Sequence, residues 1–264
     1  MIPQYWRGDP RHRHNLVTGD FANAHVPEGY VDRRRAALGV QFIAPDVTAN
    51  LSLHQDAGSL SRLGASADVT WSPGDHLSFA IAADYISLDT PLRALLHGIT
   101  ANAATARSTY VWDETRSVTL AVSYLSFTDR NQRLVFDGKF NQRLVEIPHF
   151  SLTGYTELYQ SNNSIAGAPY YNPSADASGT IGLLAEHTLW RHYDRSLVQA
   201  LTLEGGVYGE RRFKGGPIGT VAYEHRWSFN PTTEFRYGVS LGERIYDGKG
   251  TRVFGANISI VQHL

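Results

Sequence analysis

The sequence predicts an all-β fold, a transmembrane antiparallel β-barrel. Three observations predict it: apolar and polar residues alternate with period two, turn residues interrupt the alternation at regular intervals, and aromatic residues make up 11% of the chain beside 24 glycines. The 264 residues carry a formal net charge of −1, so a basic nucleic-acid-binding surface is not expected. The absence of Cys excludes disulfides, thiolate metal sites and Cys nucleophiles.

The alternation can be followed residue by residue. In Leu63–Trp71 the odd positions are apolar and the even positions are polar or small. Only the stretch Pro91–His97 suggests a helix. We expect one domain, residues 1–264, with an irregular start at residues 1–14. Fourteen strands are expected, at 15–23, 33–43, 47–55, 60–71, 75–87, 101–112, 116–126, 131–144, 149–160, 179–190, 196–209, 216–227, 233–245 and 251–263.

The connections between these segments alternate between short and long. Short turns are expected at 44–46, 72–75, 113–115, 147–148, 191–195 and 228–232. Longer loops are expected at 24–32, 56–59, 88–100, 127–131, 161–178, 210–215 and 246–250. Outer-membrane barrels have short periplasmic turns and longer extracellular loops, so this asymmetry favours a barrel in the outer membrane of a Gram-negative bacterium.

Tryptophans recur at the ends of segments, directly before short turns. They are Trp71, Trp112, Trp190 and Trp227, and Trp190 is the irregular member because it has the parity of Glu186. An indole prefers the headgroup level of a membrane, so the four would form a girdle at one interface. The alternative is an ordinary preference of Trp for strand ends.

The polar face of the segments is rich in Gly, Ser, Thr and Asn with charges of both signs, which suits a hydrated lumen. Lysine occurs only at Lys139, Lys214 and Lys249, whereas the outer face of a soluble β-sandwich is usually rich in charged residues. With fourteen to sixteen strands the interior is too wide for side chains to fill, so an aqueous channel is expected. A soluble β-sandwich that binds a ligand is the alternative from this pattern.

Short motifs between residues 90 and 248 add a family resemblance. They are Thr90–Ala94, Gly98-Ile99, Asp113–Val118, Ala168–Pro173, Trp190–Asp194, Gly205-Gly206, Tyr223–His225, Arg236–Gly238 and Tyr246–Gly248. In order and spacing they resemble the C-terminal barrel domain of the outer-membrane export porin family for poly-β-1,6-N-acetyl-D-glucosamine, a biofilm exopolysaccharide.

The resemblance implies about sixteen strands where fourteen can be counted. It also implies a pore that secretes the partly deacetylated polymer, working with a periplasmic deacetylase and an inner-membrane synthase, with no cofactor and no catalysis. The family carries periplasmic repeats before its barrel, and no such helices are expected here.

The candidate substrate-binding residues are the charged side chains of the polar face. They are Asp68, Asp84, Asp137, Glu157, Glu186, Glu204, Glu224, Glu234, Arg226 and Arg236. The family's polymer carries occasional ammonium groups, which carboxylates along the lumen would attract and release. The alternative is a cross-strand ladder of acids with Arg62, Arg107, Lys139, Arg143, Arg226 and Arg236 that holds the barrel without touching substrate.

Aromatic residues offer two further candidates. Tyr155 and Tyr159 share the polar parity and could stack on sugars, or belong to a girdle or plug. The loop Ser161–Ser178 is the longest, and Pro169, Tyr170, Tyr171 and Asn172 form a candidate gate within it. An ordinary exposed loop is the alternative.

The sequence gives little support for metal binding or catalysis. His12 and His14 lack a third ligand, so no metal site is expected. No hydrolase, metalloprotease or nucleotide-binding motif stands in a supporting context. The open alternatives to export are a general or substrate-specific porin for small solutes, and a barrel-embedded lipase or acyltransferase with a Ser/His pair.

Overall fold

The computed structural model describes residues 13–26, 29–246 and 248–262. It contains one helix, α1 (Leu92–Leu96), within these residues. The strands are β1 (Arg13–Val26), β2 (Gly29–Ile43), β3 (Val47–Gly58), β4 (Arg62–Trp71), β5 (Leu77–Tyr85), β6 (Ala101–Asp113), β7 (Arg116–Phe127), β8 (Gln132–Ile147), β9 (Phe150–Asn163), β10 (Ala175–His192), β11 (Arg195–Glu210), β12 (Gly216–Asn230), β13 (Thr233–Tyr246) and β14 (Lys249–Gln262).

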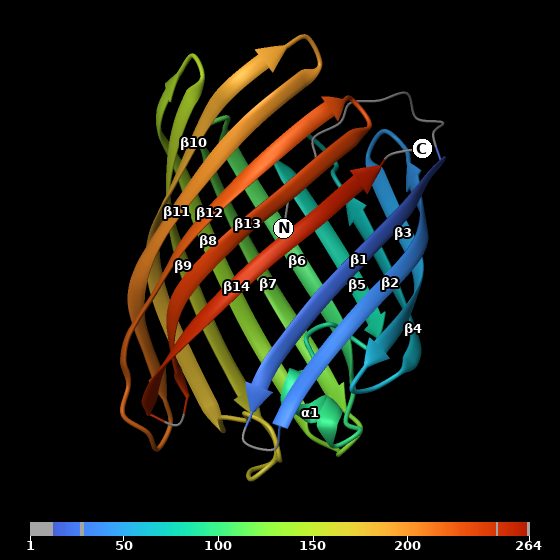
Figure 1. Cartoon of the computed structure of the whole chain (residues 1–264), viewed down its shortest axis with the longest axis vertical. Coiled ribbons are helices and arrows are strands. Elements are labelled where there is room, and N and C mark those ends of the chain that lie inside the picture. Colours follow the sequence, from blue (N-terminus) through green and yellow to red (C-terminus); the bar gives the residue numbers. More distant parts are fainter. Residues whose placement is uncertain (1–12, 27–28, 247, 263–264) are drawn as a thin grey trace.

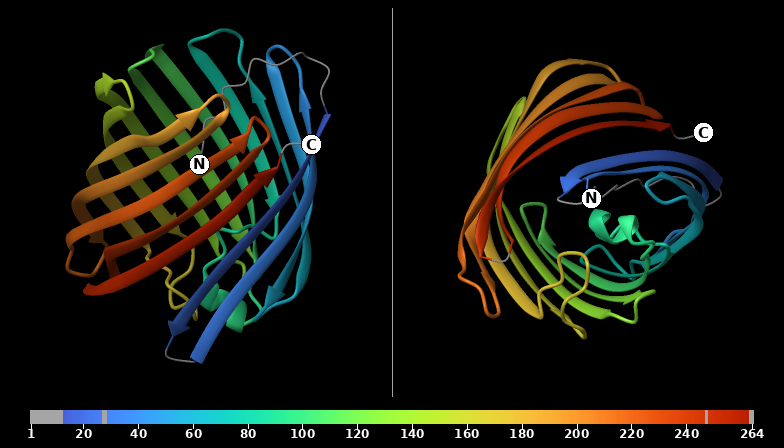
Figure 2. Two further views of the ribbon diagram at one scale, coloured as in Figure 1. Left: turned by 45° about the horizontal axis from the view of Figure 1, so that its top comes forward. Right: turned by 60° about the horizontal axis from the view of Figure 1, so that its bottom comes forward.

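The strands form a single sheet in which each is antiparallel to its neighbours in sequence, in the order β1 to β14. The sheet curls into a barrel-shaped wall (Figure 1). Within the described residues no ladder joins β1 to β14, and the ring is open between these two strands (Figure 2). All fourteen expected strands are confirmed, whereas sixteen strands are not.

Some expected boundaries are wrong. The strands β1, β2, β13 and β14 run further than the sequence pattern indicated, so the expected loops 24–32 and 246–250 are mostly strand. The expected irregular start is wrong for residues 13 and 14, which belong to β1, and residues 1–12 lie outside the described chain. These strands extend through Gly and Asp residues that are typical of turns. They do so because the neighbouring strand continues to pair with them there, as Val26 does with Gly29 and Tyr246 with Lys249.

The asymmetry of the connections is present in the fold. Even-numbered strands from β2 to β12 all end at one end of the barrel, where short turns lead to the next strand; we call it the short-turn end. The opposite, long-loop end carries the two longest connections, 86–100 with α1 and 164–174. Figure 1 shows α1 at this end. Within the described part of the chain, no helix has the length and apolar character needed to cross a bilayer.

The four tryptophans end strands that point in the same direction. They are Trp71 on β4, Trp112 on β6, Trp190 on β10 and Trp227 on β12, so all lie at the short-turn end. The irregular parity of Trp190 has a cause, because the ladder of β10 with β11 shifts register between Thr188 and Trp190. Such a bulge adds one residue and changes which face the next side chain takes. Trp190 is exposed like Trp71 and Trp112, and this supports the girdle.

Bulges of this kind recur at the short-turn end. The register also shifts in β6 around Trp112, in β8 around Leu144 and in β12 around Phe229. Each extra residue, including Leu189 in β10, is a large exposed hydrophobic side chain. The bulges therefore add apolar surface to the outer wall at one level of the barrel.

Glycine is required where strands approach closely. A Cβ on Gly206 would lie 2.1 Å from the carbonyl oxygen of Gly179 and 2.7 Å from Thr180 Cα. A Cβ on the adjacent Gly205 would meet nothing within 4 Å.

We expect Gly206→Ala to lower the free energy of unfolding by about 1–3 kcal/mol, because the backbone of β10 has to move. Gly205→Ala is the matched control and should raise it by about 0.5–1 kcal/mol, since Ala loses less chain entropy in a strand. Urea unfolding in lipid vesicles, followed by the gel mobility of the folded barrel, measures both. Equal stability of the two variants would contradict the close approach.

Candidate functional site

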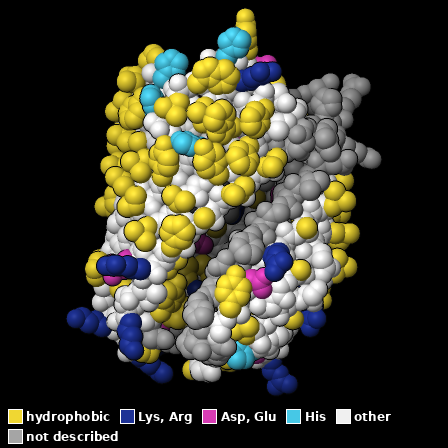
Figure 3. All heavy atoms as spheres, in the orientation of Figure 1, with side chains coloured by type: hydrophobic (Ala, Val, Ile, Leu, Met, Phe, Trp, Pro, Cys, Tyr) yellow, Lys and Arg dark blue, Asp and Glu magenta, His cyan; other side chains and the backbone are white. Residues whose placement is uncertain are grey.

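The two faces of the wall differ in chemistry. The outward face carries exposed aliphatic and aromatic side chains, for example Ile181 at 70% and Ile258 at 73% exposure. Figure 3 shows hydrophobic side chains spread over β10–β13 on this side. Such a band is suited to lipid and would be unfavourable in water. Side chains of the opposite parity form what we call the inner face.

All the candidate substrate-binding residues have inner-face parity. On each strand they alternate with exposed apolar neighbours, as Asp68 does with Val69, Asp137 with Phe136 and Glu204 with Leu203. The parity part of the prediction therefore agrees with the fold. Whether each side chain can bind a substrate depends on which other side chains it already contacts.

Most of the acids are paired with neighbouring side chains. Arg226 bridges two of them, with Nη1 2.5 Å from Glu186 Oε1 and Nε 2.6 Å from Glu224 Oε1. Arg236 pairs with Glu234, Lys139 Nζ lies 2.5 Å from Glu157 Oε1, and Asn50 donates to Asp68 at 2.8 Å. Among these ion pairs, only Lys139 with Glu157 and Arg226 with Glu186 join different strands, as in the ladder that the sequence analysis gave as an alternative. Arg226 with Glu224 and Arg236 with Glu234 pair within one strand.

Two acids differ from the rest. Asp84 and Asp137 have no direct hydrogen bond or ion pair to another residue of the described chain. The Asp137 side chain is exposed on the inner face of β8, and Asp84 lies half-buried on β5. Glu204 is intermediate, since Tyr155 donates to its Oε2 at 3.0 Å. These carboxylates are the most available to a cation in the lumen.

The tyrosines of β9 are already engaged. Tyr155 is buried over Gly182, where an added Cβ would lie 2.1 Å from Tyr155 Cζ, and Lys139 Nζ lies 4.3 Å from the centre of the Tyr155 ring. Tyr159 accepts a hydrogen bond from Arg133. A sugar could stack on Tyr155 only after Lys139 moves, so the stacking role stays a prediction.

Sequence reasoning missed a buried polar cluster that fixes the connection 86–100. Arg35 on β2 makes two hydrogen bonds with Asp56 on β3, at 2.5 and 2.8 Å, and its Nη2 donates to the Ile86 carbonyl at 2.6 Å. Arg33 Nη2 donates to the Leu88 carbonyl at 2.8 Å. The sequence did contain a signal for this cluster. Arg33, Arg34 and Arg35 are consecutive, and Arg33 and Arg35 both have the parity of the inner face.

This connection places α1 inside the outline of the strand ring, as the right view of Figure 2 shows. Ala94 of α1 packs with Leu125, Phe127 and Tyr170 in a small hydrophobic core at the long-loop end. Ile86, at the start of the connection, has a positive φ of 62°, unusual for a β-branched residue. The connection is thus held in place by side chains of β2 and by its own core.

The loop that contains the candidate gate is shorter than the expected 161–178. The strand β9 extends to Asn163 and β10 begins at Ala175, so the loop is 164–174. Tyr170 is 4% exposed and stacks on Phe127 with ring centres 5.4 Å apart. Tyr171 donates to Glu210 at 3.0 Å, and Asn172 accepts from Asn131 at 2.9 Å. The loop 164–174 is therefore anchored to the wall and is not an ordinary exposed loop.

Asn131, in the connection between β7 and β8, joins the loop 164–174 to the wall. It is fully buried, its Nδ2 lies within hydrogen-bonding distance of Asn163, Tyr170 and Asn172, and its Oδ1 accepts from Ser164. Burial raises the pKa of Tyr170 to about 12, so the phenol stays protonated at neutral pH and donates to Asp129 at 3.0 Å.

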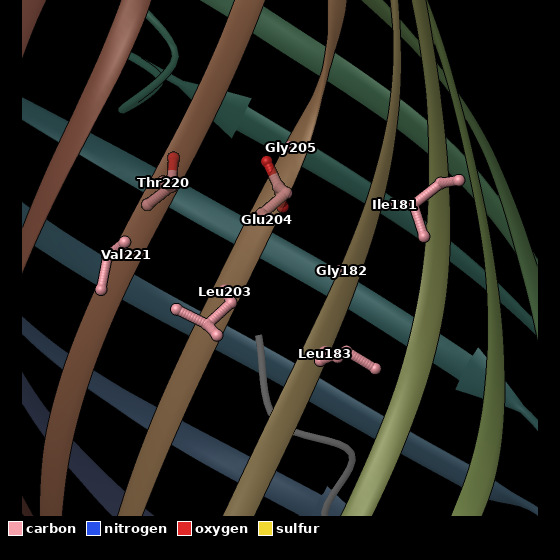
Figure 4. A pocket seen from close by; sticks show the side chains of 8 residues that line it. All are labelled: Ile181, Gly182, Leu183, Leu203, Glu204, Gly205, Thr220 and Val221. Carbon is pink, nitrogen blue, oxygen red and sulfur yellow. The ribbon is translucent and has the colours of Figure 1, made fainter.

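A shallow pocket in the wall surrounds Gly205 (Figure 4). Its lining includes the outward aliphatic side chains Ile181, Leu183, Leu203 and Val221 together with Glu204 and Thr220. The missing side chain of Gly205 creates this depression, which belongs to the lipid-facing surface. No cluster of three or more potential metal ligands is present among the described residues.

We expect Arg35→Gln to destabilise the barrel by about 3–5 kcal/mol, because Asp56 would remain buried without its cation. Arg34→Gln is the control, since the Arg34 side chain is 68% exposed and its ion pair should contribute little. Urea unfolding measures the stability, and limited proteolysis reports cleavage within 86–100. Loss of stability in both variants alike would contradict the anchoring role.

The comparisons agree with this geometry. Residues 10–261 match the family model described as the PgaA membrane beta barrel domain. The poly-beta-1,6-N-acetyl-D-glucosamine export protein of Escherichia coli K12 is 26% identical over 178 residues, which cover 67% of this chain and 21% of that protein. The match to the same protein of E. coli O157:H7 has the same values. The chain thus spans about a fifth of the length of the curated relatives it matches.

Among solved structures, one described as a bacterial polysaccharide outer membrane secretin has a TM-score of 0.82 at 19% identity, covering 96% of this chain and 97% of that one. This likeness shows the fold alone. The family match, and not this likeness, makes the chain a porin-like barrel of the outer membrane and excludes the barrel enzymes left open above. The chain belongs to the PgaA membrane beta barrel domain family.

Proposed function

We propose that this barrel, as a single domain, conducts partly deacetylated poly-β-1,6-N-acetyl-D-glucosamine across the outer membrane for secretion into a biofilm. The family match over residues 10–261 carries the proposal. The mixed polar inner face supports it, because neutral acetamido sugars and occasional ammonium groups both find hydrogen-bonding partners there. A synthase in the inner membrane and a periplasmic deacetylase would supply the polymer.

In this proposal the inner-face carboxylates attract the ammonium groups. Asp84 and Asp137 act directly, since neither makes a direct hydrogen bond or ion pair that it would have to give up within the described chain. Glu186, Glu224 and Glu234 act mainly through their arginine pairs, which hold the wall and keep charge of both signs along the path. Weak repeated contacts let the polymer move on, because no single site binds it tightly.

The first test is conductance in a planar bilayer. Current should be blocked by partly deacetylated oligomers more strongly than by fully acetylated ones, because only the former carry ammonium groups. A channel that passes small solutes by size alone, with equal block by both oligomers, would instead indicate a general porin.

We expect Asp137→Asn to weaken this block by up to about fivefold, which corresponds to about 1 kcal/mol for a solvated ion pair. Glu146→Gln is the matched control, because Glu146 is a 62% exposed side chain at the short-turn end that pairs with Arg143. The difference should shrink as salt is raised, since salt screens charges in an open lumen. Unchanged block in Asp137→Asn would remove Asp137 from the path.

We also propose that the loops 86–100 and 164–174 gate the long-loop end, with Pro169, Tyr170, Tyr171 and Asn172 in the moving part. Their hydrogen bonds and hydrophobic core support a closed resting mouth. The polymer would pass when the loop 164–174 leaves this core.

Asn131→Ala should raise single-channel conductance or opening frequency by about one to two powers of ten, because the groups it bonds lose about 1–3 kcal/mol of anchoring. Asn162→Ala is the control, since Asn162 is exposed on the same strand as Asn163. Single-channel recording distinguishes the two variants. Identical traces would argue against a gate anchored at Asn131.

A further inference from the structure

Aromatic rings and histidines gather at the short-turn end on the outer wall of β10–β13. Trp190 stacks on His192 and Trp227 stacks on Phe229, each pair with ring centres 6.2 Å apart. Figure 3 shows several histidines among hydrophobic side chains at the upper end of these strands, which is the short-turn end. Polar side chains on a lipid-facing wall mark the level where hydrocarbon ends and headgroups begin.

A pocket of about 420 Å³ opens at this level between two neighbouring turns. It is lined by residues 192–195 of the β10–β11 turn and residues 229–231 of the β12–β13 turn. Tyr193 has a positive φ of 52° and a side chain that is 85% exposed, so its ring stands away from the wall at the rim. The His192 and Tyr193 rings meet edge to face at 4.6 Å.

Three charged side chains lie in or directly beside the β10–β11 turn that lines the pocket. Within the described chain, Arg191, Asp194 and Arg195 make no ion pair or side-chain hydrogen bond. At neighbouring turns of the same end the arginines are paired, Arg116 with Asp113 at 2.6 Å and Arg143 with Glu146. The β10–β11 turn therefore differs from its neighbours in leaving both signs of charge available beside a cavity.

We propose that this pocket binds the phosphoethanolamine headgroup of a phospholipid in the leaflet at the short-turn end. The Arg195 guanidinium, with Arg191 and His192 nearby, suits a phosphate, because arginine binds phosphate oxygens through several N–H groups. The Asp194 carboxylate and the face of Tyr193 suit an ammonium group. The acyl chains would lie along the apolar wall beside Phe229 and Trp227.

The short-turn end of an outer-membrane barrel faces the periplasm, where the leaflet consists of glycerophospholipids. A bound lipid would fix the depth and tilt of the barrel at this level. The proposal is independent of the exported polymer, because it concerns the outer wall only.

Native mass spectrometry of the detergent-purified chain, titrated with phosphatidylethanolamine, tests the site. Arg195→Gln should weaken the tightest lipid adduct at least threefold. Arg212→Gln is the control, an exposed arginine in the connection 211–215 at the opposite end, and should leave the adduct unchanged. Gel mobility of the unheated protein verifies that both variants are folded.

Two further measurements identify the ligand. Asp194→Asn should abolish a preference for phosphatidylethanolamine over phosphatidylglycerol while the phosphate contact remains. Inorganic phosphate should not displace the lipid, since it lacks the ammonium group and the acyl chains. Equal lipid binding by the wild type and Arg195→Gln, or displacement by inorganic phosphate, would overturn the proposal.

Discussion

Hydrocarbon offers no hydrogen-bonding partner to a peptide group, and this constraint shapes every other feature of the chain. Each strand from β2 to β13 pairs with a strand on both sides, so the backbone groups of this part of the wall are satisfied within the sheet. With the backbone satisfied in this way, the two faces of each strand are free to differ, one toward lipid and one toward the lumen. The alternation in the sequence and the chemistry of the pore both follow from that pairing.

The strands could be predicted from the sequence because period two is a local signal that needs no knowledge of partners. The predictions failed where partners decide the outcome. The parity of Trp190 is set by a bulge against β11, and the extra length of β1 and β14 depends on neighbours that the pattern cannot show. The inner face was predicted residue by residue, but whether Glu186 is free or bound depends on Arg226, which lies 40 residues away along the chain.

The inner wall therefore has two kinds of charge, and they have different physical roles. Paired charges such as Arg226 with Glu186 and Glu224 link β12 to β10 across β11, and their field outside the group is small. Asp137 makes no direct ion pair within the described chain, so in the proposed function its charge would act at a distance on passing cations. Sequence reasoning could not separate these roles, since both use the same residue types at the same parity.

The buried amide of Asn131 has a consequence for how the mouth responds to force or ligand. The loop 164–174 and the end of β9 share hydrogen bonds to this one side chain, and the same loop shares its hydrophobic core with α1 of the other connection. Elements that share their contacts in this way separate together, because breaking one contact weakens the rest. In the proposed gate the mouth would therefore open as one cooperative unit, and a pulling chain of sugars would meet a threshold instead of a gradual yielding.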